Sequence, residues 1–309
     1  MGKYLVTGGC GFIGSHLAES LARDGHGVRV LDDLSTGKRE NLAASVELLV
    51  GDVADADLVR RAMDGVDGCF HLAAIASVER GNLDWLGTHR ANLTGAIAVF
   101  DAARRPGAIG IPVVYASSAA VFGDEPRMPL TELSPVRPLS AYGADKLGCE
   151  LHARVAGVVH GVPTVGLRFF NVYGPRQDPK SPYSGVISIF CDRLGARRPI
   201  TIFGDGLQTR DFVYVADVVA SLRAAMDSLT GVKTSLYNVC TGRSTSVVDL
   251  AHIIAGLCGI RAEITFAAPR AGEIRVSLGS PDRLKTELGV DCRTEIAEGL
   301  RATLDSLKA

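Results

Sequence analysis

The stretch KYLVTGGCGFIG, residues 3–14, decides the fold. It joins a short apolar run to a glycine-rich turn, and the apolar residues that follow over 12–23 have helical spacing. Gly9, Gly11 and Gly14 satisfy the spacing GxGxxG, and Gly8, Gly11 and Gly14 satisfy GxxGxxG. Alone this spacing is a weak signal. Between a strand and a helix, it predicts a turn whose backbone approaches a phosphate group closely.

Short apolar runs alternate with helical segments as far as Gly161, which is typical of βαβ units. Strands are expected at 3–7, 27–31, 46–50, 69–73 and 112–117, because these runs are continuously apolar, as in a parallel sheet covered on both faces. Helices are expected at 12–23, 55–63, 92–104 and 142–160, with Gly25 and Gly65 ending the first two. The sequence therefore predicts an α/β protein: a doubly wound parallel sheet of the Rossmann type with a smaller C-terminal substrate-binding lobe.

The domain boundary is expected where this alternation loosens. Residues 1–168 form the predicted Rossmann domain, and later segments near 211–240 return to it. Residues 169–309 form mainly the substrate-binding lobe, because Pro and Gly cluster from 174 to 185 and shorter elements follow.

The acidic residue that ends the second strand completes a dinucleotide fingerprint. Asp32 lies about 20 residues beyond the glycines, where a carboxylate accepts hydrogen bonds from the adenosine ribose. A carboxylate there repels a 2′-phosphate, so NAD is favoured over NADP as the cofactor. The alternative is a glycine turn and a surface aspartate that bind no ligand.

Composition excludes several other classes of protein. The chain has 309 residues, of which 47% are hydrophobic and 22% are charged, and its formal net charge is -1. A chain with this charge balance lacks the basic excess that is typical of proteins that bind nucleic acid or a membrane surface, so neither partner is expected. The seven cysteines are scattered singly, which fits neither a disulfide framework nor a metal site, so no metal is expected. The N-terminus runs directly into the first strand without a leader, so a cytoplasmic location is expected.

Tyr142 and Lys146 form a YxxxK pattern that places both side chains on one helix face. An ammonium group close to a tyrosine stabilises the phenolate and makes it a usable general base. The alternative is an exposed helix with an ordinary Tyr and Lys, but the upstream fingerprint favours the catalytic interpretation.

At these residues the sequence resembles the extended short-chain dehydrogenase/reductase family, and within it the UDP-glucose (UDP-galactose) and UDP-N-acetylglucosamine 4-epimerases. The resemblance covers nearly the whole chain, since the family's motifs occur in order: TGGCGFIG, DDLSTG, HLAA, YASSAAVFG, SAYGADK, LRFFNVYGPRQ and GDGLQTRDFVYV. It implies a catalytic group of Ser118, Tyr142 and Lys146, with Ser117 as an ordinary neighbour. His71 in HLAA has no visible partner and is expected to be a packed core histidine.

The resemblance also implies two sets of binding residues. The expected cofactor contacts are Gly8, Gly11, Phe12, Ile13, Gly14, Asp32, Asp33, Ser35, Gly37, Asp52, Val53, Leu72, Ala73, Ala74, Asn92, Tyr142, Lys146 and Phe170. The expected substrate contacts are Ser118, Tyr142, Asn171, Val186, Phe203, Arg210, Arg270 and Ser277. Guanidinium groups such as those of Arg210 and Arg270 suit a diphosphate, although either could form an ordinary salt bridge.

The implied reaction is NAD-dependent 4-epimerisation of a UDP-sugar through a 4-keto intermediate. The nearest rival, a 4,6-dehydratase, carries an Asp-Glu pair after the catalytic Ser or Thr, whereas Ala119 and Ala120 stand here and cannot move protons. Ala120 also replaces a hydroxyl that is common in relatives. A regulatory protein that binds NAD without turnover is the alternative outside enzymes.

The sugar itself stays open among hexoses, N-acetylhexosamines, pentoses and uronic acids. Relatives that accept N-acetylated sugars have a small residue at the position of Ser277, and those restricted to plain hexoses have Tyr, whose ring would occupy the acetamide volume. The resemblance also implies a homodimer formed by the helices at 92–104 and 142–160.

Overall fold

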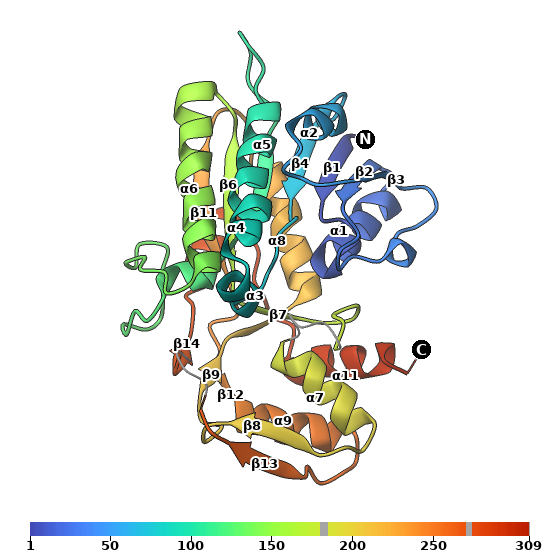
Figure 1. Cartoon of the computed structure of the whole chain (residues 1–309), viewed down its shortest axis with the longest axis vertical. Helices are drawn as coiled ribbons and strands as arrows, with labels where there is room; N and C mark the ends of the chain where they lie inside the picture. Colours follow the sequence, from blue (N-terminus) through green and yellow to red (C-terminus); the bar gives the residue numbers. More distant parts are fainter. Residues whose placement is uncertain (180–184, 270–273, 309) are drawn as a thin grey trace.

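The computed structural model describes residues 1–179, 185–269 and 274–308, and it contains a larger lobe built on a sheet and a smaller lobe beside it (Figure 1). The sheet has seven strands, all parallel, in the order β11-β6-β5-β4-β1-β2-β3. These strands are β1 (Lys3–Thr7), β2 (Gly27–Asp32), β3 (Glu47–Val50), β4 (Gly68–His71), β5 (Val113–Ser118), β6 (Thr164–Phe169) and β11 (Thr234–Val239). The strand order reverses between β1 and β4, where a crevice opens at the carboxyl ends of the strands. The expected fold class is confirmed.

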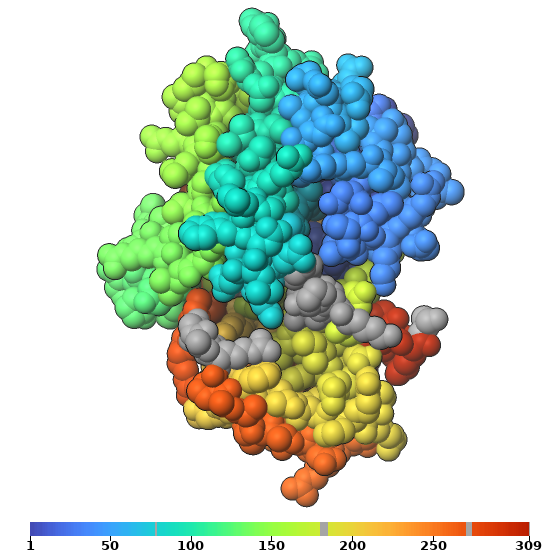
Figure 2. Space-filling model, in the orientation of Figure 1, coloured from blue at the N-terminus to red at the C-terminus, as the bar shows by residue number. Residues whose placement is uncertain are grey.

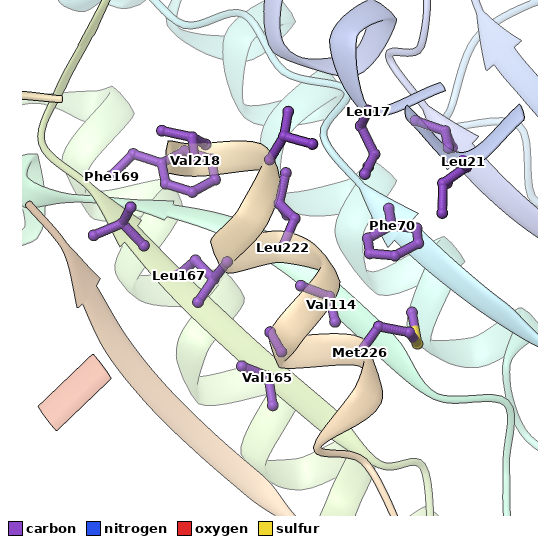
Figure 3. Close-up of a cluster of buried hydrophobic side chains, with 14 of the residues drawn as sticks. Leu17, Leu21, Phe70, Val114, Val165, Leu167, Phe169, Val218, Leu222 and Met226 are labelled. Carbon is purple, nitrogen blue, oxygen red and sulfur yellow. The ribbon is translucent and has the colours of Figure 1, made fainter. Parts of the chain in front are cut away.

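Helices cover both faces of this sheet. One face packs against α1 (Phe12–Arg23), α8 (Val215–Asp227) and α10 (Asp282–Leu288), and the other against α2 (Ala56–Met63), α5 (Gly95–Ala102) and α6 (Ala141–His160). Figure 3 shows the first of these cores, in which Leu17 and Leu21 of α1 and Leu222 of α8 face strand residues such as Phe70 and Val114. Neighbouring strand residues are therefore buried on opposite faces, which explains why the strands are continuously apolar.

The smaller lobe has a core of its own. It contains α7 (Val186–Gly195), α9 (Val247–Leu257) and α11 (Ile296–Ser306), with β8 (Ile200–Phe203) paired to β13 (Ile264–Ala267). Five shorter strands connect the two lobes: β7 (Asn171–Tyr173), β9 (Thr209–Arg210), β10 (Phe212–Tyr214), β12 (Thr245–Ser246) and β14 (Val276–Ser277). Of the described residues beyond 169, three segments lie on the large sheet instead, namely α8, β11 and α10.

The helix predicted at 92–104 begins earlier in the structure. A continuous helical run starts with α4 (Trp85–His89), passes through one π-helical stretch, η2 (Arg90–Thr94), and ends with α5. Its start is marked by Asp84, whose carboxylate accepts a hydrogen bond from the Gly87 amide at 3.0 Å. The prediction missed this start because Gly87, Thr88 and His89 have low helix propensity. A short helix, α3 (Val78–Leu83), precedes it.

Two 3-10 turns complete the architecture, η1 (Arg39–Asn41) and η3 (Ala119–Phe122). In the part of the chain that the structure describes, no helix combines the length and the apolar character needed to span a membrane.

Candidate active site

A cavity of about 640 Å³ lies at the carboxyl edge of the sheet, and residues from the glycine turn, from the ends of β2, β4, β5 and β6 and from the start of α6 line it. The smaller lobe lies below this edge, shown in yellow and orange in Figure 2. The cavity therefore stands where the strand order predicts a ligand site.

The glycine turn packs too closely for side chains. Gly8 has a φ of +69°, and a Cβ atom there would lie 2.7 Å from the Ala73 amide nitrogen. A Cβ atom on Gly14 would lie 2.2 Å from the Gly8 carbonyl oxygen. Gly11 is the N-cap of α1 and provides no side-chain hydrogen bond to the first turn. The amides and the dipole of this helix terminus thus suit an anionic group.

Asp32 is held in place at the end of β2. Its carboxylate accepts hydrogen bonds from the Cys10 amide and from the Leu34 amide, both at 2.9 Å. Burial raises the pKa of the Asp32 carboxyl, and the two amide hydrogen bonds oppose that rise. Next to it, Asp33 accepts hydrogen bonds from the Ser35 amide and hydroxyl. Two carboxylates therefore stand at this end of the cavity, and within the described residues their hydrogen-bond donors are backbone amides and the Ser35 hydroxyl.

Ser118, Tyr142 and Lys146 line the same cavity. Ser118 ends β5, and its hydroxyl accepts a hydrogen bond from the Ala120 amide at 3.1 Å. Tyr142 is in the first turn of α6, which begins where the Ser140 hydroxyl caps the Gly143 amide. The Lys146 side chain is buried, and its Nζ donates to the Ala116 carbonyl at 3.0 Å and lies 5.9 Å from the centre of the Tyr142 ring. The structure thus brings the three side chains to one cavity.

Most of the expected cofactor residues line this cavity. The set comprises Gly8, Gly11, Phe12, Ile13, Gly14, Asp32, Asp33, Ser35, Gly37, Asp52, Val53, Leu72, Ala73, Ala74, Tyr142, Lys146 and Phe170. Asn92 differs. It is fully buried, and its amide group exchanges two hydrogen bonds with the Ile75 backbone, at 2.8 and 3.2 Å. Asn92 thus holds the backbone of the segment that follows β4.

The expected substrate residues are distributed over both lobes. Asn171 lines the cavity next to Phe170. Val186 begins α7 directly after Gly185, which lines the cavity, and Phe203 ends β8 with its side chain partly exposed. Arg210 and Ser277 are register partners in the β9–β14 ladder, and the Asp211 amide donates to the Ser277 carbonyl at 2.9 Å. Arg270, and Glu273 beside it, lie outside the described residues.

His71 is buried as expected, but it has a partner. Its Nδ1 lies 2.8 Å from the hydroxyl oxygen of Thr7, and that oxygen accepts a hydrogen bond from the Ala73 amide. Burial lowers the pKa of His71 to about 3, and the nearby Lys146 ammonium adds to this shift. The imidazole is therefore neutral near pH 7, and it shares one hydrogen bond with the Thr7 hydroxyl.

The segment after β7 adds polar residues to the cavity that were not among the expected contacts. Arg176, Gln177 and Asp178 line the cavity. The Arg176 guanidinium pairs with Glu19 of α1, and Lys38 pairs with Asp178 at 3.2 Å. The motif VYGPRQ indicates that these side chains could reach a ligand site, since a charged and an amide side chain follow a Gly-Pro turn directly after a strand.

Asp211 is another residue near the site that was not among the expected contacts. It is fully buried, and its carboxylate accepts hydrogen bonds from the Thr241 amide and hydroxyl and from the Gly242 amide, at 2.7–2.9 Å. Burial raises the pKa of Asp211, and these hydrogen bonds oppose the rise. The residue ties the strand pair that contains Arg210 to the end of β11 in the large sheet.

The doubly wound sheet, the glycine turn and the Ser, Tyr and Lys residues in one cavity define an NAD-binding enzyme of the extended short-chain dehydrogenase/reductase class. The family model described as "NAD dependent epimerase/dehydratase family" matches residues 4–240. The chain belongs to that family.

Individual relatives agree with this placement. The chain is 39% identical to a UDP-glucose 4-epimerase of Mycolicibacterium smegmatis, over 98% of this chain and 97% of the relative. The structure resembles a UDP-glucose 4-epimerase of Thermotoga maritima solved with UDP-glucose, with a TM-score of 0.93, 32% identity and coverage of 99% and 98%. It also resembles a UDP-N-acetylglucosamine 4-epimerase of Methanobrevibacter ruminantium solved with UDP-N-acetylmuramic acid, with a TM-score of 0.91, 33% identity and coverage of 99% and 98%.

Proposed function

We propose that this protein is an NAD-dependent UDP-sugar 4-epimerase. The observation that carries the proposal is the convergence of Ser118, Tyr142 and Lys146 in the cavity that the glycine turn and Asp32 also line. A dinucleotide and a sugar hydroxyl can then meet in one site, which is the condition for hydride and proton transfer at the same carbon.

The residues present fit NAD. The first turn of α1 offers its amides to the pyrophosphate, and Asp32 offers a buried carboxylate to the ribose hydroxyls. Asp32 and Asp33 together disfavour the additional phosphate of NADP. The buried amide of Asn92 acts indirectly, because it orients the Ile75 backbone at the edge of the site. When bound, NAD supplies the hydride acceptor and donor for C4 of the sugar.

The chain's own residues perform the proton transfer. Tyr142 takes the proton of the sugar 4-hydroxyl, and Ser118 hydrogen-bonds the same oxygen as it becomes a ketone. The Lys146 ammonium stabilises the phenolate of Tyr142. The 4-keto sugar turns over in the site, and Tyr142 returns the proton to the 4-oxygen when the ketone is reduced on its opposite face. The net reaction inverts C4 and consumes no cofactor.

A dehydratase reaction lacks the necessary groups. Ala119 and Ala120 follow Ser118 in η3, and their methyl groups cannot expel a C6 hydroxyl. The Ala120 amide instead supports the Ser118 hydroxyl at 3.1 Å. The epimerase therefore remains the preferred reaction within the family.

The substrate range includes N-acetylated sugars in this proposal. Ser277 is the register partner of Arg210, which suits one phosphate of the UDP group, so a small side chain stands beside the proposed diphosphate site. The protein would interconvert UDP-N-acetylglucosamine with UDP-N-acetylgalactosamine as well as UDP-glucose with UDP-galactose. Arg270 belongs to the proposed diphosphate site by resemblance alone.

A homodimer is part of the proposal. The helical run that contains α4 and α5 packs beside α6, and these helices expose large apolar side chains: Leu86, Ile97, Leu151, Val155, Val158 and Val159. On α6 the spacing of Leu151, Val155 and Val158 forms one stripe, which we call the α6 stripe. Contiguous apolar surface of this kind is typical of an interface. A second copy of the same face would bury it by two-fold symmetry.

We also place the protein in the cytoplasm. Its seven cysteines are free thiols, six of them buried, as suits a reducing compartment. Cell fractionation with an antibody against the protein would test this location.

One assay tests the proposed reaction. The purified protein is incubated with UDP-glucose, UDP-galactose, UDP-N-acetylglucosamine, UDP-xylose and UDP-glucuronic acid without added cofactor, and the products are resolved by chromatography. Formation of the 4-epimer from any of them supports the proposal. Formation of a 4-keto-6-deoxy sugar would identify a dehydratase, and tight NAD binding without turnover would identify a regulatory protein.

A further inference from the structure

A buried ion pair lies behind the catalytic group. Glu150 of α6 and Arg168 of β6 have side chains that are each 4% exposed. The guanidinium binds the carboxylate through two atoms, with Nε to Oε1 at 2.8 Å and Nη2 to Oε2 at 2.7 Å. The Ser117 hydroxyl donates to the same carboxylate at 2.5 Å. We call these three residues the Ser117 cluster.

Stability alone does not account for this cluster. Two charges lose their hydration when they are buried, and apolar residues of similar volume often give equal or greater stability. The cluster instead fixes geometry, because a guanidinium that binds a carboxylate through two atoms sets both the distance and the relative orientation of the two side chains. A hydroxyl that donates to the shared carboxylate oxygen is fixed as well.

The three members belong to the three segments that build the catalytic site. Ser117 directly precedes Ser118 in β5, and Arg168 is its register partner in β6, two residues before Phe170. Glu150 lies one turn beyond Lys146 on the same face of α6. The cluster therefore joins the strand end, the catalytic helix and the neighbouring strand at one point.

Helix α6 reaches β5 at two successive residues. Lys146 donates to the Ala116 carbonyl at 3.0 Å, and Glu150 accepts from the Ser117 hydroxyl. Two such contacts, one helical turn apart, prevent α6 from sliding or rotating against β5. Arg168 adds a third support, because its guanidinium lies 4.8 Å from the ring centre of Phe122 in η3, the turn that Ser118 caps.

We propose that the Ser117 cluster sets the position of Ser118 relative to Tyr142 and Lys146, and that Ser117 is a positioning residue for the reaction. The inference rests on the proposed function, since it concerns the same reacting hydroxyl. Ser117 acts through the Glu150 carboxylate. Loss of its hydroxyl lets the end of β5 shift against α6, so turnover falls while the affinity for the nucleotide parts of both ligands is kept.

The first test compares Ser117→Ala with Ser221→Ala. Ser221 is also fully buried, and its hydroxyl donates to the Asp217 carbonyl at 2.8 Å in α8, away from the cluster. With UDP-glucose we expect Ser117→Ala to lower kcat about tenfold, as for the loss of roughly one hydrogen bond to a charged group, with KM and NAD content unchanged. Ser221→Ala should keep the wild-type kcat, and Ser117→Thr, which restores a hydroxyl, should recover most of it.

The second test separates positioning from stability. Glu150→Gln leaves the Arg168 charge buried without its counter-ion, so both thermal stability and kcat should fall. The double variant with Glu150→Met and Arg168→Met removes both charges, and we expect its melting temperature to return close to the wild-type value while kcat stays at least tenfold low. Recovery of kcat together with stability would overturn the proposal, and so would wild-type kcat in Ser117→Ala. The wild-type rate itself reports on the epimerase function, and the ratio of variant to wild type reports on the cluster.

Discussion

The hydroxyl of Tyr142 is the group on which turnover depends most directly. It lines the cavity beside Ser118 and within reach of the Lys146 ammonium. We expect Tyr142→Phe to lower kcat at least about a hundredfold, as for the loss of a general base, with the fold intact. Tyr173→Phe is the control, because its buried hydroxyl donates to the Ile296 carbonyl at 3.5 Å in the smaller lobe. Near-normal turnover by Tyr142→Phe would mean that another residue abstracts the proton.

The buried imidazole of His71 makes stability depend on pH. Its pKa is about 3 in the folded chain, whereas an exposed histidine has a pKa of about 6.5. Between these values only the unfolded chain takes up the proton. The contribution of neutral His71 to the free energy of unfolding is therefore fully present above about pH 6.5. It is lost as the pH drops toward 3, by up to about 1.4 kcal/mol per pH unit. His71→Asn should flatten this dependence in urea titrations between pH 7 and 5. Parallel curves for the two proteins would contradict the assignment.

The side chain of Ser277 decides the proposed acceptance of N-acetylated sugars. A tyrosine ring there would occupy the space that a C2 acetamide needs, and packed sites tolerate little overlap. Ser277→Tyr should therefore abolish turnover of UDP-N-acetylglucosamine and spare UDP-glucose. Val276→Tyr is the matched control, because the preceding residue of β14 points to the opposite face of the strand. If Ser277→Tyr keeps both activities, Ser277 does not face the sugar.

At the scale of elements, the start of α6 links folding to catalysis. The Ser140 hydroxyl caps this helix two residues before Tyr142, and Ser246 caps α9 in the same way. Replacing either serine by Ala should lower the free energy of unfolding by about 1 kcal/mol. Only Ser140→Ala should also lower kcat, since fraying at that end moves Tyr142. Equal kcat values in the two variants would show that the end of α6 is held by packing alone.

The elements that sequence predicted well are those fixed by local pattern. The first strands were found because each is apolar on both faces, and α1 was predicted with its observed bounds because Gly25, with a φ of +81°, stops it. The two- and three-residue strands β7, β9, β10, β12 and β14 could not be predicted, because pairing with distant segments alone makes them strands.

The site divides in the same way. Spacing within one segment indicates Tyr142 and Lys146, and the resemblance to the family adds Ser118. The structure gathers all three in one cavity. Ser117 was treated as an ordinary neighbour, because its partner Glu150 lies 33 residues away and nothing local signals a buried carboxylate. The contact of Asn92 with the cofactor stays a prediction from the resemblance, and the structure adds that its side-chain amide bonds the Ile75 backbone twice. Contacts between segments decide such roles.

For the whole molecule, the chain crosses between the two lobes several times. Residues 215–239 form α8 and β11 on the large sheet, and α10 returns there after β14. Three sets of contacts join the lobes around the cavity. They are the hydrogen bonds of Asp211, the ion pair of Arg176 with Glu19 and the ion pair of Lys38 with Asp178. We propose that the sheet lobe comprises 1–168 with these returning segments. The position of the cavity between the lobes follows from this path of the chain.

The proposed dimer is a property of the whole molecule that the α6 stripe makes testable. Val158 is the last residue of the stripe and is 75% exposed, and a glutamate there would bring like charges together across a two-fold axis and bury them in both copies. Val158→Glu should therefore shift the sedimentation coefficient from that of a dimer to that of a monomer. Val232→Glu is the matched control, because Val232 is also exposed, at 53%, but lies in the turn before β11, outside the stripe. A wild-type protein that sediments as a monomer, or a Val158→Glu variant that stays dimeric at micromolar concentration, would contradict the assignment of this face as the interface.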